Sequence, residues 1–540
     1  MANPSLQIGN SNWAIKEDNL LGYSTVGTNY LPKPMTMTRE SAGTRVNSSG
    51  LVETVELLGS EEITGFTNGT SYPFSTFTTS GNNITSAIIS SSFAGAVSNS
   101  ISIVNGKTYK VTFTYTKNSG DDLRVLISNS ISGAGTSISN IEQVSASGDI
   151  TLFFTATSTT TGYLQMGTGS GSDSLDISIT NISVKESTKN NLARVDYDGT
   201  ASSLLVEPER TNLVTYSEDF SNGWAYFDSS TDANELISPS GVLDASKFIE
   251  GNGSSIKRII NLSQSIVSGN DYTFSIFAKK GERDFITLTN STGTADVTTT
   301  FDLTNGTVTS GIGTIESLTN GWFRCSRSFT ATATVTSNYI VQAFINNGSG
   351  ISYQGDGTSG LYIWGVDFQK GSYPTSYIPT DGGTVTRNQD QYSKTGISNL
   401  INSEEGVLFL EATREDNTNY ISKITLNDGS KVNQLVIQYR FGYNLVANLT
   451  IASASTSIST NTLTPVSNKI AIVWAFNRLE LWVNGSKIGE ITTAGTFPAN
   501  TLSRLMFSEG DGTDDFFGKI KQLQVFKTAL TDTELITLTT

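Results

Sequence analysis

Strict alternation of apolar and polar residues is the dominant pattern along the chain. Residues 107–115 (KTYKVTFTY) and 271–277 (DYTFSIF) are clear examples. A period of two residues is typical of an antiparallel strand with one face buried. Asn-Gly, Ser-Gly and Asp-Gly turns separate these runs at short intervals. The pattern therefore predicts an all-β chain of β-sandwiches with very little helix.

Three of these elements recur in the same order. The run 105–117 is similar to 269–280, FTAT occurs at 154–157 and again at 329–332, and the strand at 175–187 is similar to that at 360–372. We predict two related sandwich domains at 55–187 and 210–384, although generic strand composition could also give such likenesses. The first domain interrupts a leader region. We predict that this leader covers residues 1–54, which form an attachment region, and that it continues at 188–209 after the inserted domain. Insertion of a domain is tolerated where the two ends of the insert lie close together.

The remaining sequence predicts a linker at 385–395 and a further domain at 396–540. In this last domain, the predicted central strands 470–476 and 478–483 precede an Asn484-Gly485 turn, which is a strong hairpin signal. Near the end, Thr531 and Glu534 have the spacing of a capping box and predict a short helix.

Composition excludes several classes of function. The 540 residues suit three or four domains, and the net charge of −15 disfavours nucleic acid and anionic lipid as partners. Histidine is absent, which excludes Ser-His-Asp and Cys-His catalysis and His-ligated zinc. The single cysteine, Cys325, predicts a buried strand residue and no intrachain disulfide. We expect neither a signal peptide nor a membrane span.

Two segments resemble tail, fibre and other virion proteins of bacteriophages: 204–224 (LLVEPERTNLVTYSEDFSNGW) and 361–381 (LYIWGVDFQKGSYPTSYIPTD). Residues 44–53 and 191–199 resemble the leader of that family, split by the extra domain. Residues 406–540 resemble concanavalin A-like lectin/glucanase (laminin G-like) domains, and the two repeats are similar to jelly-roll carbohydrate-binding modules. The resemblance implies tandem jelly-roll-like sandwiches, a C-terminal concanavalin A-like sandwich and a protein of the virion surface.

The function expected from this resemblance is that of a non-enzymatic phage fibre or decoration that presents glycan-binding-type domains for host adhesion. It would be made in the host cytoplasm, assemble with other virion proteins, and form a homotrimer, as fibres commonly do. One alternative is a purely structural capsid or tail component with no glycan ligand. Another is a bacterial surface adhesin or polysaccharide-active enzyme. The Glu-x-Asp-x-x-Glu spacing of related glucanases does not occur, so we expect no enzyme activity.

Sugar binding needs aromatic faces for stacking, and core packing is the alternative use of the same residues. The candidates are Trp224, Tyr226, Tyr439, Phe441 and Tyr443. No cofactor is required, but a structural Ca²⁺ would need clustered carboxylates, for which solvated turns are the alternative. The candidate ligands are Glu509, Asp511, Asp514 and Asp515 in one loop, with Glu218, Asp219 and Asp367 as a second set.

Overall fold

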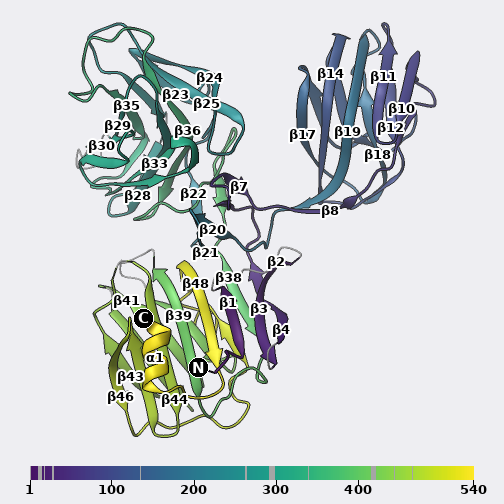
Figure 1. Ribbon diagram of the computed structural model, residues 1–540. Helices are drawn as coiled ribbons and strands as arrows, with labels where there is room; N and C mark the ends of the chain where they lie inside the picture. Colours follow the sequence, from purple (N-terminus) through teal and green to yellow (C-terminus); the bar gives the residue numbers. More distant parts are fainter. Residues whose placement is uncertain are drawn as a thin grey trace. The chain divides into compact units, whose positions relative to one another are not determined.

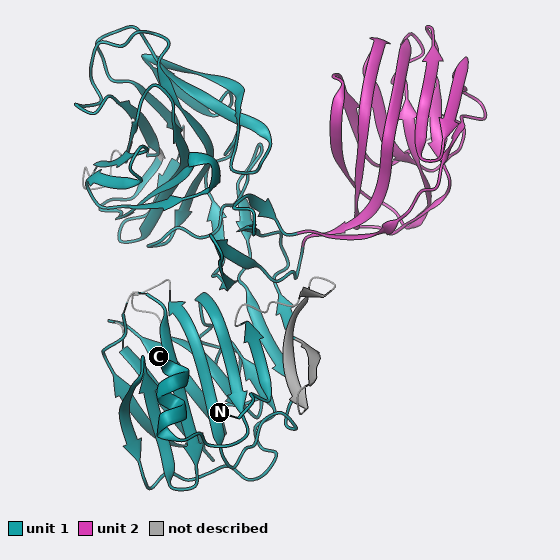
Figure 2. Ribbon diagram, viewed as in Figure 1, with its two compact units in different colours: residues 1–55, 190–540 teal, residues 56–189 magenta. Residues whose placement is uncertain are grey.

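A computed structural model describes residues 2–9, 15–16, 19–26, 29–133, 136–261, 264–290, 298–338, 340–414, 421–442, 444–464 and 466–540. The chain forms two compact units (Figure 2), one of residues 1–55 with 190–540 and the other of residues 56–189. Strands make up nearly all of the regular structure (Figure 1), so the prediction of an all-β chain with very little helix is confirmed.

The unit of residues 56–189 is a sandwich of two six-stranded sheets. The predicted domain of 55–187 differs from it by one or two residues at each end. One sheet contains β8 (Leu57–Glu61), β10 (Thr76–Ser80), β11 (Asn83–Ile89), β14 (Thr108–Gly120), β17 (Gly148–Thr155) and β19 (Leu175–Thr188). The other contains β9 (Phe66–Asn68), β12 (Gly95–Ser98), β13 (Ile101–Ile103), β15 (Leu123–Ser128), β16 (Ser137–Val144) and β18 (Thr160–Gly167).

A second sandwich of two six-stranded sheets lies in the larger unit. One sheet contains β24 (Ser229–Ile237), β25 (Leu243–Glu250), β28 (Asp271–Lys280), β32 (Thr314–Ser317), β33 (Phe323–Thr330) and β36 (Gly360–Lys370). The other contains β23 (Trp224–Phe227), β26 (Arg258–Asn261), β29 (Phe285–Thr289), β30 (Thr298–Asp302), β31 (Thr307–Ser310) and β35 (Gln342–Asn346).

The repeated runs occupy equivalent places in these two sandwiches. The strand β14 pairs with β19 and β17, and β28 pairs in the same way with β36 and β33. In both central strands the apolar residues of the alternating run are buried. In β14 the polar residues between them are partly exposed, whereas in β28 Thr273 and Ser275 are buried as well.

The C-terminal sandwich includes strands from the beginning of the chain. Its sheet of 11 described strands contains β1 (Leu6–Gly9), β2 (Ile15–Lys16), β3 (Asn19–Val26), β4 (Asn29–Pro34), β20 (Val195–Asp198), β21 (Ala201–Val206), β39 (Gly406–Arg414), β44 (Asn468–Ala475), β45 (Arg478–Val483), β46 (Ser486–Ile491) and β48 (Gly518–Phe526). Its seven-stranded sheet contains β5 (Thr36–Thr38), β38 (Gln391–Thr395), β40 (Ser422–Asn427), β41 (Gln434–Arg440), β42 (Asn444–Ile451), β43 (Ala454–Thr460) and β47 (Arg504–Met506).

The leader and linker segments are thus parts of sheets. The strand β1 pairs with β48, which places Leu6 opposite Val525 and Ile8 opposite Leu523, and both Leu6 and Ile8 are fully buried. The strand β38, from the predicted linker, pairs with β5 and β47. Such strands of three to five residues are too short to show a periodic pattern, so the sequence did not reveal them.

Three two-stranded ladders complete the larger unit: β6 (Thr44–Val46) with β7 (Val52–Thr54), β22 (Arg210–Asn212) with β37 (Val385–Arg387), and β27 (Gln264–Ile266) with β34 (Val335–Asn338). A short 3₁₀ turn, η1, covers Thr319–Gly321. The helix α1 (Asp532–Thr539) has the predicted capping box between Thr531 and Glu534. In the described part of the chain, no helix is long and apolar enough to cross a membrane.

The first prediction concerns β1. Leu6→Ala should lower the free energy of unfolding of the C-terminal sandwich by about 2–5 kcal/mol, because it leaves a cavity beside β48. Urea denaturation followed by tryptophan fluorescence would measure this. Ile536→Ala is the control, since its side chain is 46% exposed, and it should change stability by no more than about 0.5 kcal/mol. Equal effects of both substitutions would contradict the role of β1 in the core.

Candidate functional site

The outward face of one sheet of the second sandwich carries a row of aromatic and polar side chains. Ile259, Ile286 and Ala343 point into the core, so their strand neighbours point outward. Strand pairing aligns five outward residues across the sheet, and we call them the outward row: Phe227, Arg258, Phe344, Thr287 and Thr300. Because they come from five antiparallel strands, the sheet fixes their spacing.

Arg258 is held in place within the outward row. Its guanidinium carbon lies 4.9 Å from the centre of the Phe227 ring, and its Nη1 donates a hydrogen bond to Gln342 Oε1 at 3.2 Å. The Phe227 side chain is 54% exposed. No carboxylate in the described part of the chain forms an ion pair with Arg258. The row therefore presents an exposed ring beside a positioned guanidinium that lacks a counter-charge.

Polar groups continue the row on the neighbouring strands. The Thr287 and Thr300 hydroxyls lie 2.9 Å apart, and Asn346 Nδ2 donates to Thr287 Oγ1 at 3.1 Å. Thr287 and Asn346 are buried and support the row from below, whereas Thr300 is half-buried, so its hydroxyl is the one of these groups that a polyol can reach. The face thus combines the two features that sugar recognition needs, an aromatic surface and planar or hydroxylic polar groups.

Two predicted binding aromatics lie on the same strand as Phe227 but point the other way. Trp224 is 8% exposed, and its Nε1 donates to the Tyr216 carbonyl at 3.0 Å. The Tyr226 ring packs against the core, and its hydroxyl donates to the Phe220 carbonyl. Adjacent strand residues face opposite sides, so Tyr226 and Phe227 cannot share a face. Phe227 is not among the predicted residues, because the sequence alone does not assign the two faces of this strand.

The other predicted aromatics do not form one exposed strand face. Tyr439 is 2% exposed, points into the core and lies 5.6 Å from Phe516 between ring centres, and burial raises the pKa of its hydroxyl. Since β41 ends at Arg440, Phe441 lies in the turn that follows, where it is 61% exposed. Tyr443 lies outside the described residues.

The carboxylates of the loop at 509–515 are largely paired with lysines. Lys423 Nζ lies 2.7 Å from Glu509 and 2.9 Å from Asp514. Lys431 Nζ lies 2.8 Å from Glu509 and 3.0 Å from Asp511. Burial alone would raise the pKa of Glu509, but the lysines outweigh it and lower that pKa. Ammonium groups thus fill the positions around these oxygens that a cation would take.

The remaining loop carboxylate and the second predicted ligand set also have protein partners. Asp515 accepts a hydrogen bond from Gln389 Nε2 at 3.2 Å. Glu218 accepts from the Tyr377 hydroxyl at 2.8 Å, and Asp219 accepts from the backbone N–H of Ser221 at 2.8 Å.

Asp367 is buried, accepts from Gln369 Nε2 at 2.6 Å and lies 3.8 Å from Arg324. Throughout the described ranges, no group of three or more Asp, Glu, Cys or His side chains could hold a metal ion.

A buried network of three arginines and two carboxylates lies where the leader, its return segment and the linker meet. Arg39 Nη1 donates to Asp390 Oδ1 at 2.8 Å, and Arg194 donates to the other oxygen of Asp390. Glu207 Oε2 lies 2.7 Å from Arg194 Nη1 and 2.8 Å from Arg387 Nη1. Burial would raise the pKa of Glu207, but Arg387 and Arg194 hold it well below its usual range. We call these five residues the junction network.

The two segments that carry the family resemblance meet at the junction network. Glu207, from the first segment, accepts hydrogen bonds from the Ser376 backbone N–H at 2.8 Å and from its hydroxyl at 2.7 Å. Asn212, also from the first segment, donates to the carbonyls of Val366 and Ile378. Ser376, Val366 and Ile378 belong to the second segment. The residues behind the resemblance are therefore structural in this chain.

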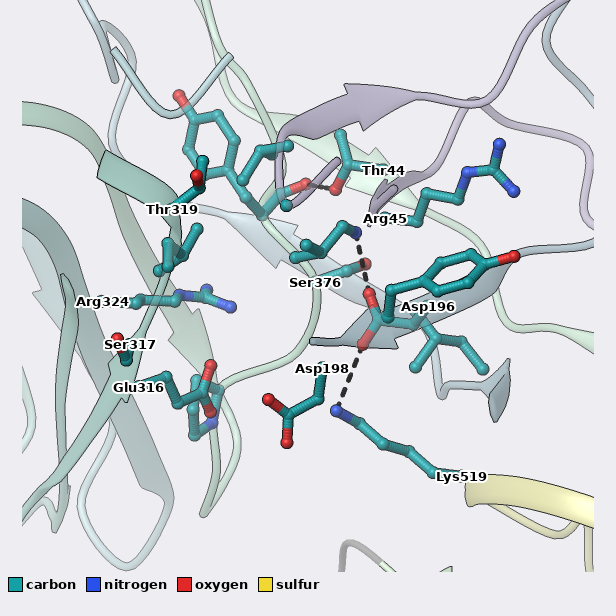
Figure 3. A pocket seen from close by; sticks show the side chains of 18 of the residues that line it. Thr44, Arg45, Asp196, Asp198, Glu316, Ser317, Thr319, Arg324, Ser376 and Lys519 are labelled. Carbon is teal, nitrogen blue, oxygen red and sulfur yellow. Dashed lines mark hydrogen bonds and ion pairs between the residues drawn. The ribbon is translucent and has the colours of Figure 1, made fainter. Parts of the chain in front are cut away.

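A cavity of about 810 Å³ opens beside the junction network, and Glu207 and Ser376 line part of it (Figure 3). Asp196 accepts the Val46 backbone N–H at 2.8 Å and lies 3.3 Å from Lys519 Nζ. Burial raises the pKa of Asp196 despite Lys519. The cavity offers mixed polar contacts, among them this pair of a carboxylate and an ammonium group.

Comparisons with known proteins give partial structural likenesses. No protein-family model and no curated protein matches the chain. The CBM40 domain of the Ruminococcus gnavus IT-sialidase is 19% identical over 26% of this chain and 84% of its own, with a TM-score of 0.23. A tandem pair of CBM22 domains from Paenibacillus barcinonensis is 9% identical over 62% of this chain and 98% of its own, with a TM-score of 0.19. None of these similarities assigns the chain to a family.

The junction network generates the second prediction. Asp390→Asn should destabilise the larger unit by about 3–5 kcal/mol, because it leaves two buried guanidinium groups without their shared counter-charge. The midpoint of urea-induced unfolding would measure the loss. Glu53→Gln is the control, since Glu53 pairs with Arg45 at 2.9 Å but is 37% exposed, and it should cost less than about 1 kcal/mol. A midpoint for Asp390→Asn equal to that of the control would contradict the importance of the network.

Asp367 generates a pH-dependent prediction. Burial raises the pKa of Asp367 to about 6, although Arg324 opposes the shift. The folded state therefore binds a proton more tightly than the unfolded state does, because the pKa of an aspartate in the unfolded chain is about 3.9. Protonated Asp367 therefore adds about 3 kcal/mol to the free energy of unfolding below about pH 4. This contribution is lost as the pH rises through about 6.

Asp367→Asn should remove this part of the pH dependence. Unfolding midpoints measured from about pH 4 to about pH 7 should fall more steeply for the parent than for the variant. Since other titrating groups are common to both proteins, the difference between the two curves isolates Asp367. Parallel curves would show that its carboxyl titrates normally in the folded chain.

Proposed function

We propose that this chain is a non-enzymatic surface protein of a bacteriophage particle, a fibre or decoration that presents glycan-binding sandwiches to the host surface. The observation that carries the proposal is the outward row of the second sandwich. There, an exposed aromatic ring, a positioned guanidinium and hydrogen-bonding side chains share one sheet face. Such a rigid arrangement suits recognition of a sugar, because little side-chain freedom remains to be lost on binding.

The particle-surface part of the proposal rests on the resemblance of 204–224 and 361–381 to phage virion proteins. In this chain the first segment supplies Glu207 to the junction network, and the second supplies Ser376, which donates hydrogen bonds to Glu207. A rigid connection of this kind between the second sandwich and its neighbouring segments suits a protein that must hold a binding face away from a particle. Assembly into trimers, as proposed for a fibre, would let several weak sugar sites act together.

The absence of histidine in the sequence and the pairing of Glu509 with two lysines support a binding role over a catalytic one. A glycoside hydrolase needs two carboxylates that flank a sugar at a defined separation. The second sandwich instead offers the uncompensated Arg258 and no carboxylate paired with it in the part that the structure describes.

Two measurements test the proposal together. Antibody against the C-terminal sandwich should label purified phage particles in cryo-electron microscopy, and the purified chain should retain specific oligosaccharides on a glycan array. Unlabelled particles would overturn the virion role. A flat array profile with labelled particles would instead favour a purely structural component.

A fourth prediction links the array to the outward row. Phe227→Ala should weaken retention of bound glycans by about 3- to 10-fold, because an exposed aromatic contact contributes about 0.5–1.5 kcal/mol. Phe476→Ala is the matched control, since Phe476 is also exposed, at 73%, but lies in the C-terminal sandwich. Equal effects of the two substitutions would place the sugar site elsewhere.

A further inference from the structure

Arg258 lacks the acidic partner that several other arginines of the larger unit have. The sequence has 49 acidic and 34 basic residues, and guanidinium groups elsewhere in this unit pair with carboxylates. Arg283, for example, lies 2.6 Å from Glu250, and Arg39 lies 2.8 Å from Asp390. Arg258 forms no ion pair within the described ranges, although acidic residues are in excess.

The geometry around Arg258 leaves donors unused. Its Nη1 bonds to Gln342, whereas its Nε is buried and donates no hydrogen bond within the part of the chain described. A ligand cannot reach the buried Nε, but Nη2, which makes no hydrogen bond within the part of the chain described, can donate to a bound anion. The Phe227 ring and Gln342 already hold the guanidinium in position, so a bound anion would need to order it little further.

The acidic residue on the same sheet face does not compete for Arg258. Asp302 Oδ1 accepts the backbone N–H groups of Thr304 and Asn305, at 2.8 and 3.0 Å. Its Oδ2 accepts from Asn305 Nδ2 at 2.7 Å. This carboxylate is therefore committed to its own turn, and it does not neutralise the guanidinium.

We propose that the outward row binds an acidic sugar, whose carboxylate pairs with Arg258 while its ring contacts the exposed part of Phe227. The inference rests on the proposed function and adds the class of glycan to it. A planar guanidinium with free donors matches a carboxylate in both charge and shape, and a neutral sugar would leave that charge uncompensated.

The test compares the full-length chain with three variants on an array of matched neutral and carboxylated oligosaccharides, including lactose beside sialyllactose and neutral beside uronate oligomers. Arg258→Gln should weaken retention of carboxylated glycans by about tenfold or more, as expected when a charged hydrogen bond is lost. Arg258→Lys should bind at an intermediate level, because it keeps the charge but not the planar fork. Arg440→Gln, which removes one exposed positive charge from the C-terminal sandwich, should bind as the parent does.

Salt gives an independent readout. Raising NaCl from about 0.05 M to about 0.5 M should weaken binding of carboxylated glycans by the parent and leave residual binding by Arg258→Gln unchanged. An unchanged melting temperature would show that this variant folds. Equal retention of neutral and carboxylated glycans by parent and Arg258→Gln would overturn the inference and leave the proposed function standing. An array with no bound glycan would overturn both.

Discussion

The larger unit depends on the pairing of buried guanidinium groups with Glu207 and Asp390. The three arginines come from residues 39, 194 and 387, which lie in three separate stretches of the chain. A buried guanidinium without a carboxylate is strongly unfavourable, so each stretch is committed to this one meeting point. Apolar contacts could hold the same segments together, but they would tolerate small shifts. The charge pairs demand one register for the leader, its return segment and the linker.

This dependence changes what the family resemblance means. The runs around Glu207 and Ser376 supply the carboxylate, the backbone donors and the asparagine that close the second sandwich. These runs therefore connect the second sandwich to the rest of the larger unit, and they contain none of the five residues of the outward row. In the function proposed above, ligand choice would lie with the sheet face around Phe227 and Arg258, which is outside both runs. Proteins that share this connection could thus bind different ligands, because a fold does not determine its function.

Much of the fold could be predicted because its strands are long and half-buried. The alternation in 107–115 and 271–277 identified β14 and β28, and Asn484-Gly485 identified the turn between β45 and β46. The short strands β1, β5 and β38 could not be found, since three to five residues show no period. Their pairing joins the first 40 residues to the last 150, and no local pattern reports a contact over that distance.

The candidate site was predictable only in part, for a different physical reason. A run such as Trp224 to Phe227 shows that aromatic residues are concentrated there. Whether one of them can bind a ligand depends on which residues face outward. A shift of one residue in that assignment exchanges core and surface for the whole strand. Charged residues add a second difficulty, because sequence alone does not show which guanidiniums are neutralised. Arg258 and Arg194 look alike in the sequence, yet one is locked between two carboxylates and the other has none. The residues that the proposed function assigns to ligand binding therefore depend on which arginines lack a carboxylate, and only the three-dimensional neighbours of each arginine show this.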